Sequence, residues 1–465
     1  MAGLCFGVLL LVFMNLLEGK WLIAVLSGIA LLCALLLSGR IERFLFGFLF
    51  FAFPFNADFK FKFYWLPEGA ESLTISVISL SLALLYPFFI LRILQRGSAA
   101  RAAWPVGFAV LIGVIGWASL SMLNAQDYRL SLILLVHWAI SVLLYFYLSN
   151  RVENRDDLWW VARWFMAGLL LECLICWGQY LTQSSLGLEM FSEREELHGV
   201  LIGSERFFRL VGTFNHPNVL GTYLVAALPV VLALNFAPTR FWMRLFIFAL
   251  SGLGVSTLIF TLNRSAWLAA GLSWIGLFIW IVKRRYIRFR LIQLLVVFVI
   301  LGVIFGFFGP LIAARWMEDD RGSAASRIPQ IQMALAMVER HPVLGVGLGN
   351  YGSVKHLYET YFYNPSDMGR VYSDEFLVHN AYLLMASEIG VVGLVWFAWL
   401  VWTIVRAARI QISHLSDARS RLILAGFLSG FFALLINNAA QPRYFGAHVL
   451  FWCCSGVLVS GIRDS

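Results

Sequence analysis

Residues 243–282 read MRLFIFALSGLGVSTLIFTLNRSAWLAAGLSWIGLFIWIV, two apolar runs joined by the short polar stretch Asn263-Arg264-Ser265. Each run is close to the roughly 20 apolar residues that cross the hydrocarbon core of a bilayer as an α-helix. A helix is required there because lipid offers no partner for an unpaired backbone amide or carbonyl. The stretch therefore predicts two membrane-spanning helices of opposite direction, connected by a tight turn.

Fourteen apolar runs of this kind follow one another along the 465-residue chain. They lie at about 3–17, 21–38, 44–55, 73–95, 104–123, 130–148, 158–182, 217–236, 243–262, 265–282, 290–312, 379–405, 422–438 and 444–461. The chain is 60% apolar and 13% charged, whereas a soluble domain carries about a quarter charged residues. This composition excludes a soluble enzyme. Because some runs are short, we predict an all-α fold, a polytopic integral membrane bundle of 12–14 transmembrane helices in a single domain over residues 1–465.

The basic residues predict which side of the membrane each loop occupies. Loops near 40–43, 92–101, 151–155, 240–244, 283–290, 406–421 and 463 hold 19 Lys and Arg, against 6 in the short loops of the other side. Cytoplasmic loops are enriched in Lys and Arg, so we expect both termini in the cytoplasm. The two long insertions, at about 183–216 and 313–378, are then outside, and the net charge of +9 reflects topology rather than nucleic-acid binding.

His379 lies at the predicted outer end of a long apolar run, directly before Asn380. An unperturbed histidine has a pKa near 6.5, which suits it to act as a general base near neutral pH. The alternative is an interfacial histidine that only bonds a neighbouring loop. Glu388 is about 13 Å deeper along the same helix, so we expect it to brace the bundle rather than to share a proton with His379.

Two further segments carry arginines at the same boundary. Arg264 occupies the tight turn, and its planar guanidinium suits a phosphate or diphosphate. In residues 206–218, RFFRLVGTFNHPN, Arg209 stands among aromatic residues that suit a phosphate and a sugar face, and Gly212 and Pro217 mark a turn before a helix. The alternative in both cases is an anchor at the lipid headgroups.

The second long insertion contains one helical pattern and one glycine-rich stretch. We expect an amphipathic helix on the outer membrane surface, with Ser326 as its N-cap and Pro329 in its first turn. Its apolar positions at helical spacing are Ile331, Ala334, Leu335 and Val338. The stretch Gly345-Val346-Gly347-Leu348-Gly349 follows no strand and precedes no Lys-Ser or Lys-Thr, so it is not predicted to bind a nucleotide.

The sequence predicts neither a metal site nor a cofactor. Glu318-Asp319-Asp320 is a compact acidic cluster without further ligands, which is typical of a solvated loop edge. The six cysteines fall in apolar runs without a second Cys or His pair, so a zinc site is not expected. Within the spans, His137 and Glu172 lie at compatible depths, and we expect them to pair structurally.

Four blocks of residues together resemble the O-antigen ligase and Wzy-type polymerase superfamily of bacterial membrane glycosyltransferases. The resemblance covers about residues 205–400 and departs from the usual pattern at Ser265 and His216. The blocks are Gly212-Thr213-Phe214-Asn215-His216-Pro217-Asn218; the turn with Arg264; Arg327 with His341-Pro342 and Gly345-Val346-Gly347; and His379-Asn380 with Glu388 and Gly390.

The resemblance implies a metal-independent glycosyltransferase at the periplasmic face of the inner membrane, in lipopolysaccharide biosynthesis. The implied partners are a glycan donor on undecaprenyl diphosphate, an acceptor in lipid A core or another glycan, and membrane lipids. It maps the catalytic base onto His379 and the arginine that holds the leaving diphosphate onto Arg264. The candidate substrate-binding residues are Arg209, Arg327, His216, His341 and Asn380.

Within this family the favoured activity is ligation of O-antigen to lipid A core, and the alternative is polymerisation of O-antigen or exopolysaccharide, which uses the same donor. A more distant alternative is a flippase for lipid-linked oligosaccharides, or another transporter. A flippase should carry its cations in a central cavity that reaches both leaflets, whereas the candidate cations of this chain gather at the outer boundary.

Overall fold

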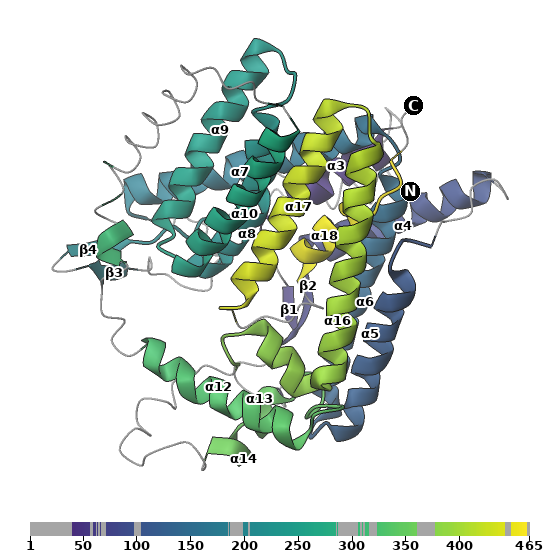
Figure 1. The fold of residues 1–465 in the computed structure, drawn as a ribbon, viewed down its shortest axis with the longest axis vertical. Helices are drawn as coiled ribbons and strands as arrows, with labels where there is room; N and C mark the ends of the chain where they lie inside the picture. The colour runs from purple at the N-terminus through teal and green to yellow at the C-terminus, as the bar shows by residue number, and fades with distance from the viewer. Residues whose placement is uncertain are drawn as a thin grey trace, which may run out of the picture.

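A computed structural model describes residues 40–55, 59–61, 63, 66, 71–96, 104–184, 186, 199–202, 205–284, 286, 306, 309, 312–315, 323–359, 377–441 and 448–462. The spans predicted at 3–17 and 21–38, most of the span at 290–312, and the acidic cluster Glu318–Asp320 lie outside these residues. The described chain is a bundle of helices (Figure 1).

Most of the structure is α-helix. The bundle contains α3 (Ile41–Phe51), α4 (Val77–Arg96), α5 (Phe108–Ser121), α6 (Tyr128–Arg151), α7 (Arg155–Thr182), α8 (Pro217–Leu234), α9 (Phe241–Phe260), α10 (Arg264–Lys283), α16 (Ala381–His414), α17 (Ala418–Asn438) and α18 (Val449–Leu458). The segment between α10 and α16 contributes α12 (Ser323–Arg340), α13 (Tyr351–Val354) and α14 (His356–Glu359), and a 3-10 turn, η2 (Met122–Asn124), follows α5.

The helices confirm a polytopic membrane protein. Among the described residues, eight helices are long and apolar enough to cross a membrane: α4, α6, α7, α8, α9, α10, α16 and α17. Two small antiparallel sheets were not predicted; they pair β1 (Phe59–Phe61) with β2 (Leu73–Ile75), and β3 (Gly199–Ile202) with β4 (Glu205–Phe208). The fold is therefore helical, with two short hairpins between helices.

Polar caps set where many of the helices begin. A side chain at the N-cap accepts a hydrogen bond from a backbone N–H of the first turn, which has no partner within the helix. The capping residues are Asp127 before α6, Asn154 before α7, His216 before α8, Asn263 before α10, Asn380 before α16, Asp417 before α17 and His448 before α18. Three residues proposed from the sequence as part of the site, or next to it, are therefore also helix caps.

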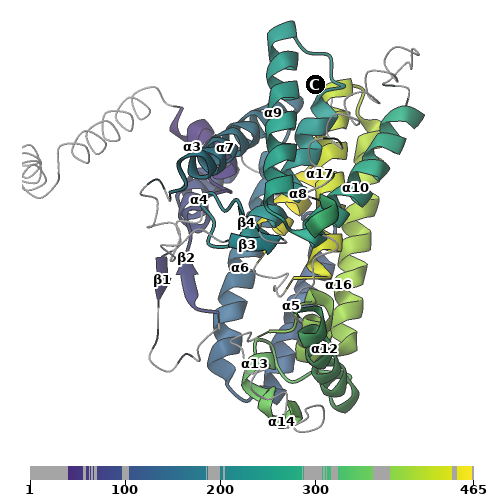
Figure 2. The same cartoon turned by 90° about the vertical axis from the view of Figure 1, so that its left-hand side faces the viewer.

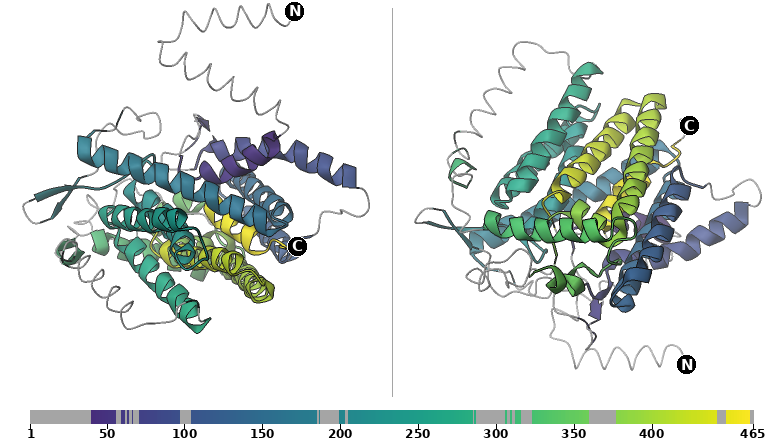
Figure 3. Two further views of the ribbon diagram at one scale, coloured as in Figure 1. Left: turned by 90° about the horizontal axis from the view of Figure 1, so that it is seen from above. Right: turned by 60° about the horizontal axis from the view of Figure 1, so that its bottom comes forward.

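The centre of the bundle is the pair α8 and α17. In the most apolar 18 residues of α8, 83% of the residues are buried, against 28% in the corresponding stretch of α4. The two helices approach closely because α17 presents glycines to the backbone of α8: a Cβ on Gly430 would lie 2.4 Å from the carbonyl oxygen of Ala226, and one on Gly426 would lie 2.5 Å from Val230 Cα. Figures 2 and 3 show α17 beside α8 and α10 from three sides.

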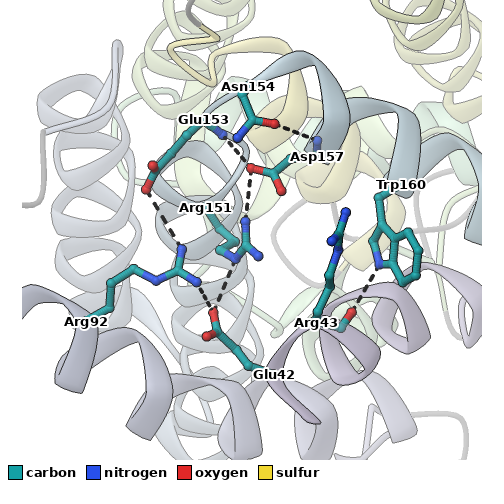
Figure 4. A network of polar contacts seen from close by, with 8 residues as sticks. All are labelled: Glu42, Arg43, Arg92, Arg151, Glu153, Asn154, Asp157 and Trp160. Carbon is teal, nitrogen blue, oxygen red and sulfur yellow. Dashed lines mark hydrogen bonds and ion pairs between the residues drawn. The ribbon is translucent and has the colours of Figure 1, made fainter. Parts of the chain in front are cut away.

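A network of ion pairs fastens four helices at one end of the bundle (Figure 4). Buried Arg151, the last residue of α6, contacts Glu42 of α3 at 3.3 Å and Asp157 of α7 at 3.1 Å. Arg92 of α4 pairs with the same Glu42 carboxylate and lies 3.9 Å from Glu153. The chain crosses the bundle along α7 from this end to the segment that leads into α8, so the network and the N-terminus of α8 lie at opposite ends.

The helix expected in the second insertion is present as α12, with a different start. It begins at Ser323, so the expected N-cap at Ser326 is wrong, and Pro329 lies inside the helix rather than in its first turn. Two alanines, Ala324 and Ala325, supply the helix propensity that extends α12 ahead of the proline. In Figure 1, α12 runs across the bundle at the end where α16 begins, and α13 and α14 lie beside it.

The faces of α12 also differ from the expected ones. Its buried face is made by Gln330, Met333, Ala334 and Met337, and α12 packs against α16. Of the apolar positions that we expected, Ala334 is buried, whereas Ile331 and Leu335 are exposed. Methionines therefore occupy the protein side, and branched apolar residues occupy the outer side.

Substituting Gly430 with alanine should destabilise the α8–α17 contact, because the new methyl group meets backbone rather than a movable side chain. Overpacking of this kind costs about 1–3 kcal/mol. The measurement is the thermal midpoint of the detergent-solubilised protein, which should fall for Gly430→Ala. Gly252→Ala on α9 is the matched control, because its Cβ would meet nothing within 4 Å. Equal midpoints for the two variants would contradict the packing described for α8 and α17.

Candidate active site

The turn that carries Arg264 is held in an unusual backbone conformation. Leu262 has a φ of 52°, in the left-handed region, which costs a residue other than glycine roughly 1–3 kcal/mol. Asn263 then caps α10 by accepting from the N–H of Ala266 at 3.2 Å. The cap makes Arg264 the first residue of α10, so the guanidinium leaves the helix at its N-terminal end.

Two more arginines hold the carbonyl oxygens of this turn. Arg209 Nε donates to the oxygen of Thr261 at 2.8 Å, and Arg315 Nε donates to the oxygen of Leu262 at 3.5 Å. We call Arg209, Arg264 and Arg315 the arginine cluster. These residues are far apart in the sequence, and the turn gathers them at the N-terminus of α10.

The arginine cluster concentrates positive charge at partly buried positions. Arg209 also donates to Asn218 Oδ1 at 3.0 Å, so its described hydrogen bonds go to neutral oxygens. Burial, and after it the charge of Arg315, lowers the pKa of Arg209 to about 10, which leaves the guanidinium charged at neutral pH. Cations held close together at partly buried positions favour an anion that neutralises them.

A polar network joins the start of α10 to the end of α17. Ser265 Oγ lies 2.8 Å from Asn263 Oδ1 and 3.0 Å from Asn437 Oδ1. Gln441 donates to Ser265 Oγ at 3.1 Å, and Asn437 donates to Thr222 Oγ1 of α8 at 2.9 Å. Ser265, the position that departs from the usual family pattern, therefore anchors the arginine-bearing turn to α17 and α8.

The segment before α8 is shaped by two residues of α7. Gly212 has a φ of 66° and exchanges two hydrogen bonds with the side chain of Gln179, at 3.0 and 2.9 Å. Thr213 donates its N–H to Glu172 Oε1 at 2.9 Å. A Cβ on Gly212 would lie 1.8 Å from that carboxylate oxygen, so only glycine fits. The predicted turn before α8 is confirmed.

The structure corrects the expected pairing of His137 with Glu172, and it shows a capping contact made by His216. Glu172 binds Thr213, and His137 lies 3.1 Å from Thr74 Oγ1, so the expected pairing of His137 with Glu172 is wrong. Each therefore contacts a threonine hydroxyl rather than the other residue, and the Nδ1 of His137 is buried without a described hydrogen-bond partner. His216 accepts from the N–H of Asn218 at 3.0 Å through Nδ1 and caps α8. Its role toward substrate stays a prediction.

Helix α16 is broken within its length, and the break organises the second half of the site. Gly390 has φ 74° and ψ 172°, which interrupts the helix. Backbone groups released there bind the glycine-rich stretch: Val346 donates to the oxygen of Ser387 at 2.8 Å, and Val391 donates to the oxygen of Pro342 at 2.8 Å.

Glu388 completes this arrangement. Its carboxylate accepts the N–H of Gly349 at 2.9 Å and the N–H of Tyr351 at 3.1 Å, while its own carbonyl accepts from Gly347 at 3.0 Å. Glu388 is 1% exposed. It therefore braces the bundle as the sequence predicted, and the glycine-rich stretch packs on the broken helix.

His379 lies just ahead of α16 and contacts α12. Its main-chain N and its ring Nδ1 each lie 3.3 Å from Gln330 Oε1. The next residue, Asn380, caps α16 by accepting from the N–H groups of Tyr382 at 3.0 Å and Leu383 at 3.1 Å. The cap fixes the direction in which the chain enters α16, and so fixes the place of His379 beside α12.

Of the two other candidates on α12, only one lies near His379. Arg327 is exposed and stands about one turn before Gln330. His341 is exposed at the other end of α12, about 21 Å from Arg327 at 1.5 Å per residue. The two side chains therefore belong to different parts of the surface, and both roles toward substrate stay predictions.

The C-terminal end of α17 links the two halves of the site. Tyr382, one turn after His379, donates to the oxygen of Leu435 at 2.7 Å. Ser265, next to Arg264, contacts Asn437, two residues further along α17. The proposed base and the arginine cluster thus both border one end of α17, although His379 lies 64 to 170 residues from the three arginines in the sequence.

Two residues of this site were not singled out from the sequence. Arg315 belongs to the stretch Ala313-Ala314-Arg315-Trp316, which carries no pattern that distinguishes it from an interfacial anchor. Gln330 stands three residues after Arg327, and this separation of about one helical turn is the only signal that could have placed it. For the described residues, no group of three or more His, Cys, Asp or Glu side chains is placed to hold a metal ion.

Part of the chain matches a known protein family. Residues 249–398 match the family model described as O-Antigen ligase. The matched segment runs from within α9 to within α16 and contains Arg264, Arg315, Gln330, His379 and Glu388, whereas Arg209 and His216 precede it. No curated protein matches the chain.

Replacing Glu388 with alanine should loosen the glycine-rich stretch, because two buried N–H groups would lose their acceptor. Each unsatisfied buried group costs about 1–3 kcal/mol. We expect a lower thermal midpoint and faster proteolysis between residues 341 and 351. Glu339→Ala, an exposed carboxylate on α12, is the matched control. The same midpoint in both variants would show that Glu388 does not hold the stretch.

Proposed function

Because the chain carries an O-antigen ligase domain at residues 249–398, we propose that it transfers a glycan from undecaprenyl diphosphate to an acceptor hydroxyl at the periplasmic face of the inner membrane. The acceptor that we propose is lipid A core. The observation that carries the proposal is the convergence of His379 and the arginine cluster at one end of α17. An acid–base group and an anion site are the two parts that this reaction requires.

The arginine cluster suits the leaving group. When the glycosidic bond to the carrier breaks, negative charge accumulates on the departing diphosphate, and cations already in position stabilise it without rearrangement. Arg264 sits at the N-terminus of α10, where the helix dipole adds to the positive potential. Arg209 and Arg315 border the same turn. We propose that these charges do the work of a divalent cation, and that transfer needs no metal.

His379 suits the acceptor side. A hydroxyl is a weak nucleophile, and a positioned base that takes its proton accelerates attack. His379 is partly exposed at the start of α16, so a hydroxyl arriving from outside the bundle reaches it without unfolding of the helix. Arg327, on the neighbouring turn of α12, is available for negative charges of either substrate.

His379→Ala should lose about 100- to 10,000-fold in transfer, because a general base contributes that much, and should still bind donor. Arg264→Lys should be nearly as inactive as Arg264→Ala, because an ammonium keeps the charge but not the planar fork. The measurement is transfer of O-antigen from undecaprenyl diphosphate to lipid A core by purified protein in EDTA.

Arg129→Lys is the matched control for these variants, because Arg129 is exposed and pairs with the neighbouring Asp127 at 2.9 Å. Near wild-type transfer by His379→Ala would refute its role as the base. Loss of wild-type transfer in EDTA, restored by magnesium or manganese, would refute the metal-independent account. Transfer to a second lipid-linked glycan in place of the core would identify a polymerase.

Cysteines introduced at Arg409 and His356 should differ in labelling by an impermeant thiol reagent in cells with a permeabilised outer membrane. Both positions are exposed in the structure, but the distribution of Lys and Arg puts Arg409 on the cytoplasmic side and His356 outside. We expect His356→Cys to react and Arg409→Cys to react only after the inner membrane is opened. The reverse pattern would move the proposed site to the cytoplasm.

A further inference from the structure

Gln330 is a buried polar side chain on an otherwise apolar helix face. It is 8% exposed and shares its face of α12 with Met333 and Met337, at 4% and 0%. A buried amide is costly unless hydrogen bonds satisfy it. Its side-chain oxygen meets His379 twice, once at the main-chain N and once at ring Nδ1, both at 3.3 Å.

The double contact fixes both the amide and the imidazole. A main-chain N–H can only donate, so the Gln330 atom that faces it must be the carbonyl oxygen Oε1 rather than the amide nitrogen. Because Nδ1 faces the same acceptor, Nδ1 must carry a proton to form its hydrogen bond. A neutral imidazole has one N–H, so the lone pair of His379 is on Nε2.

A buried tyrosine of the core fixes the main chain of Gln330. Its main-chain oxygen accepts from the hydroxyl of Tyr351 at 3.3 Å, and the N–H of Tyr351 donates to Glu388 Oε1 at 3.1 Å. Tyr351 is 1% exposed. Hydrogen bonds therefore link the carboxylate beside the break in α16 to Tyr351, Tyr351 to Gln330, and Gln330 to the ring of His379, with the covalent frames of Tyr351 and Gln330 between them.

We propose that Gln330 is a positioning residue for glycan transfer, which holds His379 in the Nδ1-protonated tautomer with Nε2 directed to the acceptor hydroxyl. The inference rests on the proposed function. In the step, Nε2 takes the hydroxyl proton as the acceptor oxygen bonds to the anomeric carbon. The bond from that carbon to the diphosphate oxygen breaks, the diphosphate leaves with the electron pair, and the imidazolium then releases its proton to water.

A carboxylate in place of the Gln330 amide tests the contact directly. The charged or titratable side chains described on the helices around this end of α16 are Arg327, Glu339 and Arg340 on α12, Tyr351 on α13, His356 and Tyr358 on α14, and Tyr382 and Glu388 on α16. Glu339 and Arg340 lie about 14 and 15 Å along α12 from Gln330, at 1.5 Å per residue. The Glu388 carboxylate accepts N–H groups of the glycine-rich stretch, and the Tyr382 hydroxyl bonds to Leu435. Gln330→Glu therefore adds a negative charge next to Nδ1, which favours the protonated ring.

The experiment follows carbethoxylation of His379 by diethyl pyrocarbonate, which attacks the unprotonated ring, as a function of pH in the full-length protein. Mass spectrometry of the peptide that contains His379 gives the midpoint. We expect Gln330→Glu to raise this midpoint by about one pH unit, and the acid limb of the pH profile of transfer to move by the same amount. Gln332→Glu, an exposed glutamine two residues along α12, is the matched control and should leave both unchanged.

Gln330→Leu gives a second test that adds no buried charge. Without the acceptor at Nδ1, kcat should fall by about 10- to 100-fold, the range for partners that orient functional histidines in metal sites. KM should stay within about twofold, because the lost interaction acts on the chemical step. Equal falls in kcat and in thermal midpoint for Gln330→Leu and Met333→Ala would reduce Gln330 to a packing residue and overturn the proposal.

The outcomes separate this inference from the proposed function. An unchanged midpoint in folded Gln330→Glu overturns the positioning role while His379→Ala still tests the base. A shifted midpoint together with near wild-type transfer by His379→Ala overturns the base role, and the positioning role with it. A shifted midpoint, a shifted pH profile and an inactive His379→Ala support both.

Discussion

A backbone group inside a membrane must find a partner within the protein, and this constraint organises the site. The break in α16 at Gly390 releases backbone groups among buried residues of an apolar helix. The glycine-rich stretch supplies their partners, and Trp117 of α5 adds a hydrogen bond to the oxygen of Ile389 at 3.0 Å. Because α12 leads directly into that stretch, satisfying the break also places α12 beside His379.

The turn before Arg264 also has backbone groups that find partners within the protein, but here the donors are charged side chains. The carbonyl oxygens of Thr261 and Leu262 accept hydrogen bonds from guanidinium groups rather than from backbone amides. Arginine suits this because its fork can bond a carbonyl through one nitrogen and present others to a ligand. Under the proposed function, the cations that stabilise the turn are also those that would meet the anionic leaving group.

Much of the helical architecture follows from the sequence because hydrophobic length acts locally. Runs of the right length became α6 to α10 with ends within a few residues of the expected ones, and the role of Glu388 followed from its depth in the helix. Contacts between distant segments do not follow from such patterns. Arg315, Gln330 and the hydroxyl partners of Glu172 and His137 depend on how segments meet at the helix ends, which no local period encodes.

The central claim is that one site holds both the leaving diphosphate and the base. Its most direct test is an experimental structure of His379→Ala bound to an undecaprenyl-diphosphate-linked glycan. The account predicts the diphosphate against the arginine cluster, with the anomeric carbon on the side of residue 379. Diphosphate bound at the other end of the bundle, near Arg92 and Arg151, or at His341 and away from Arg264, would contradict it.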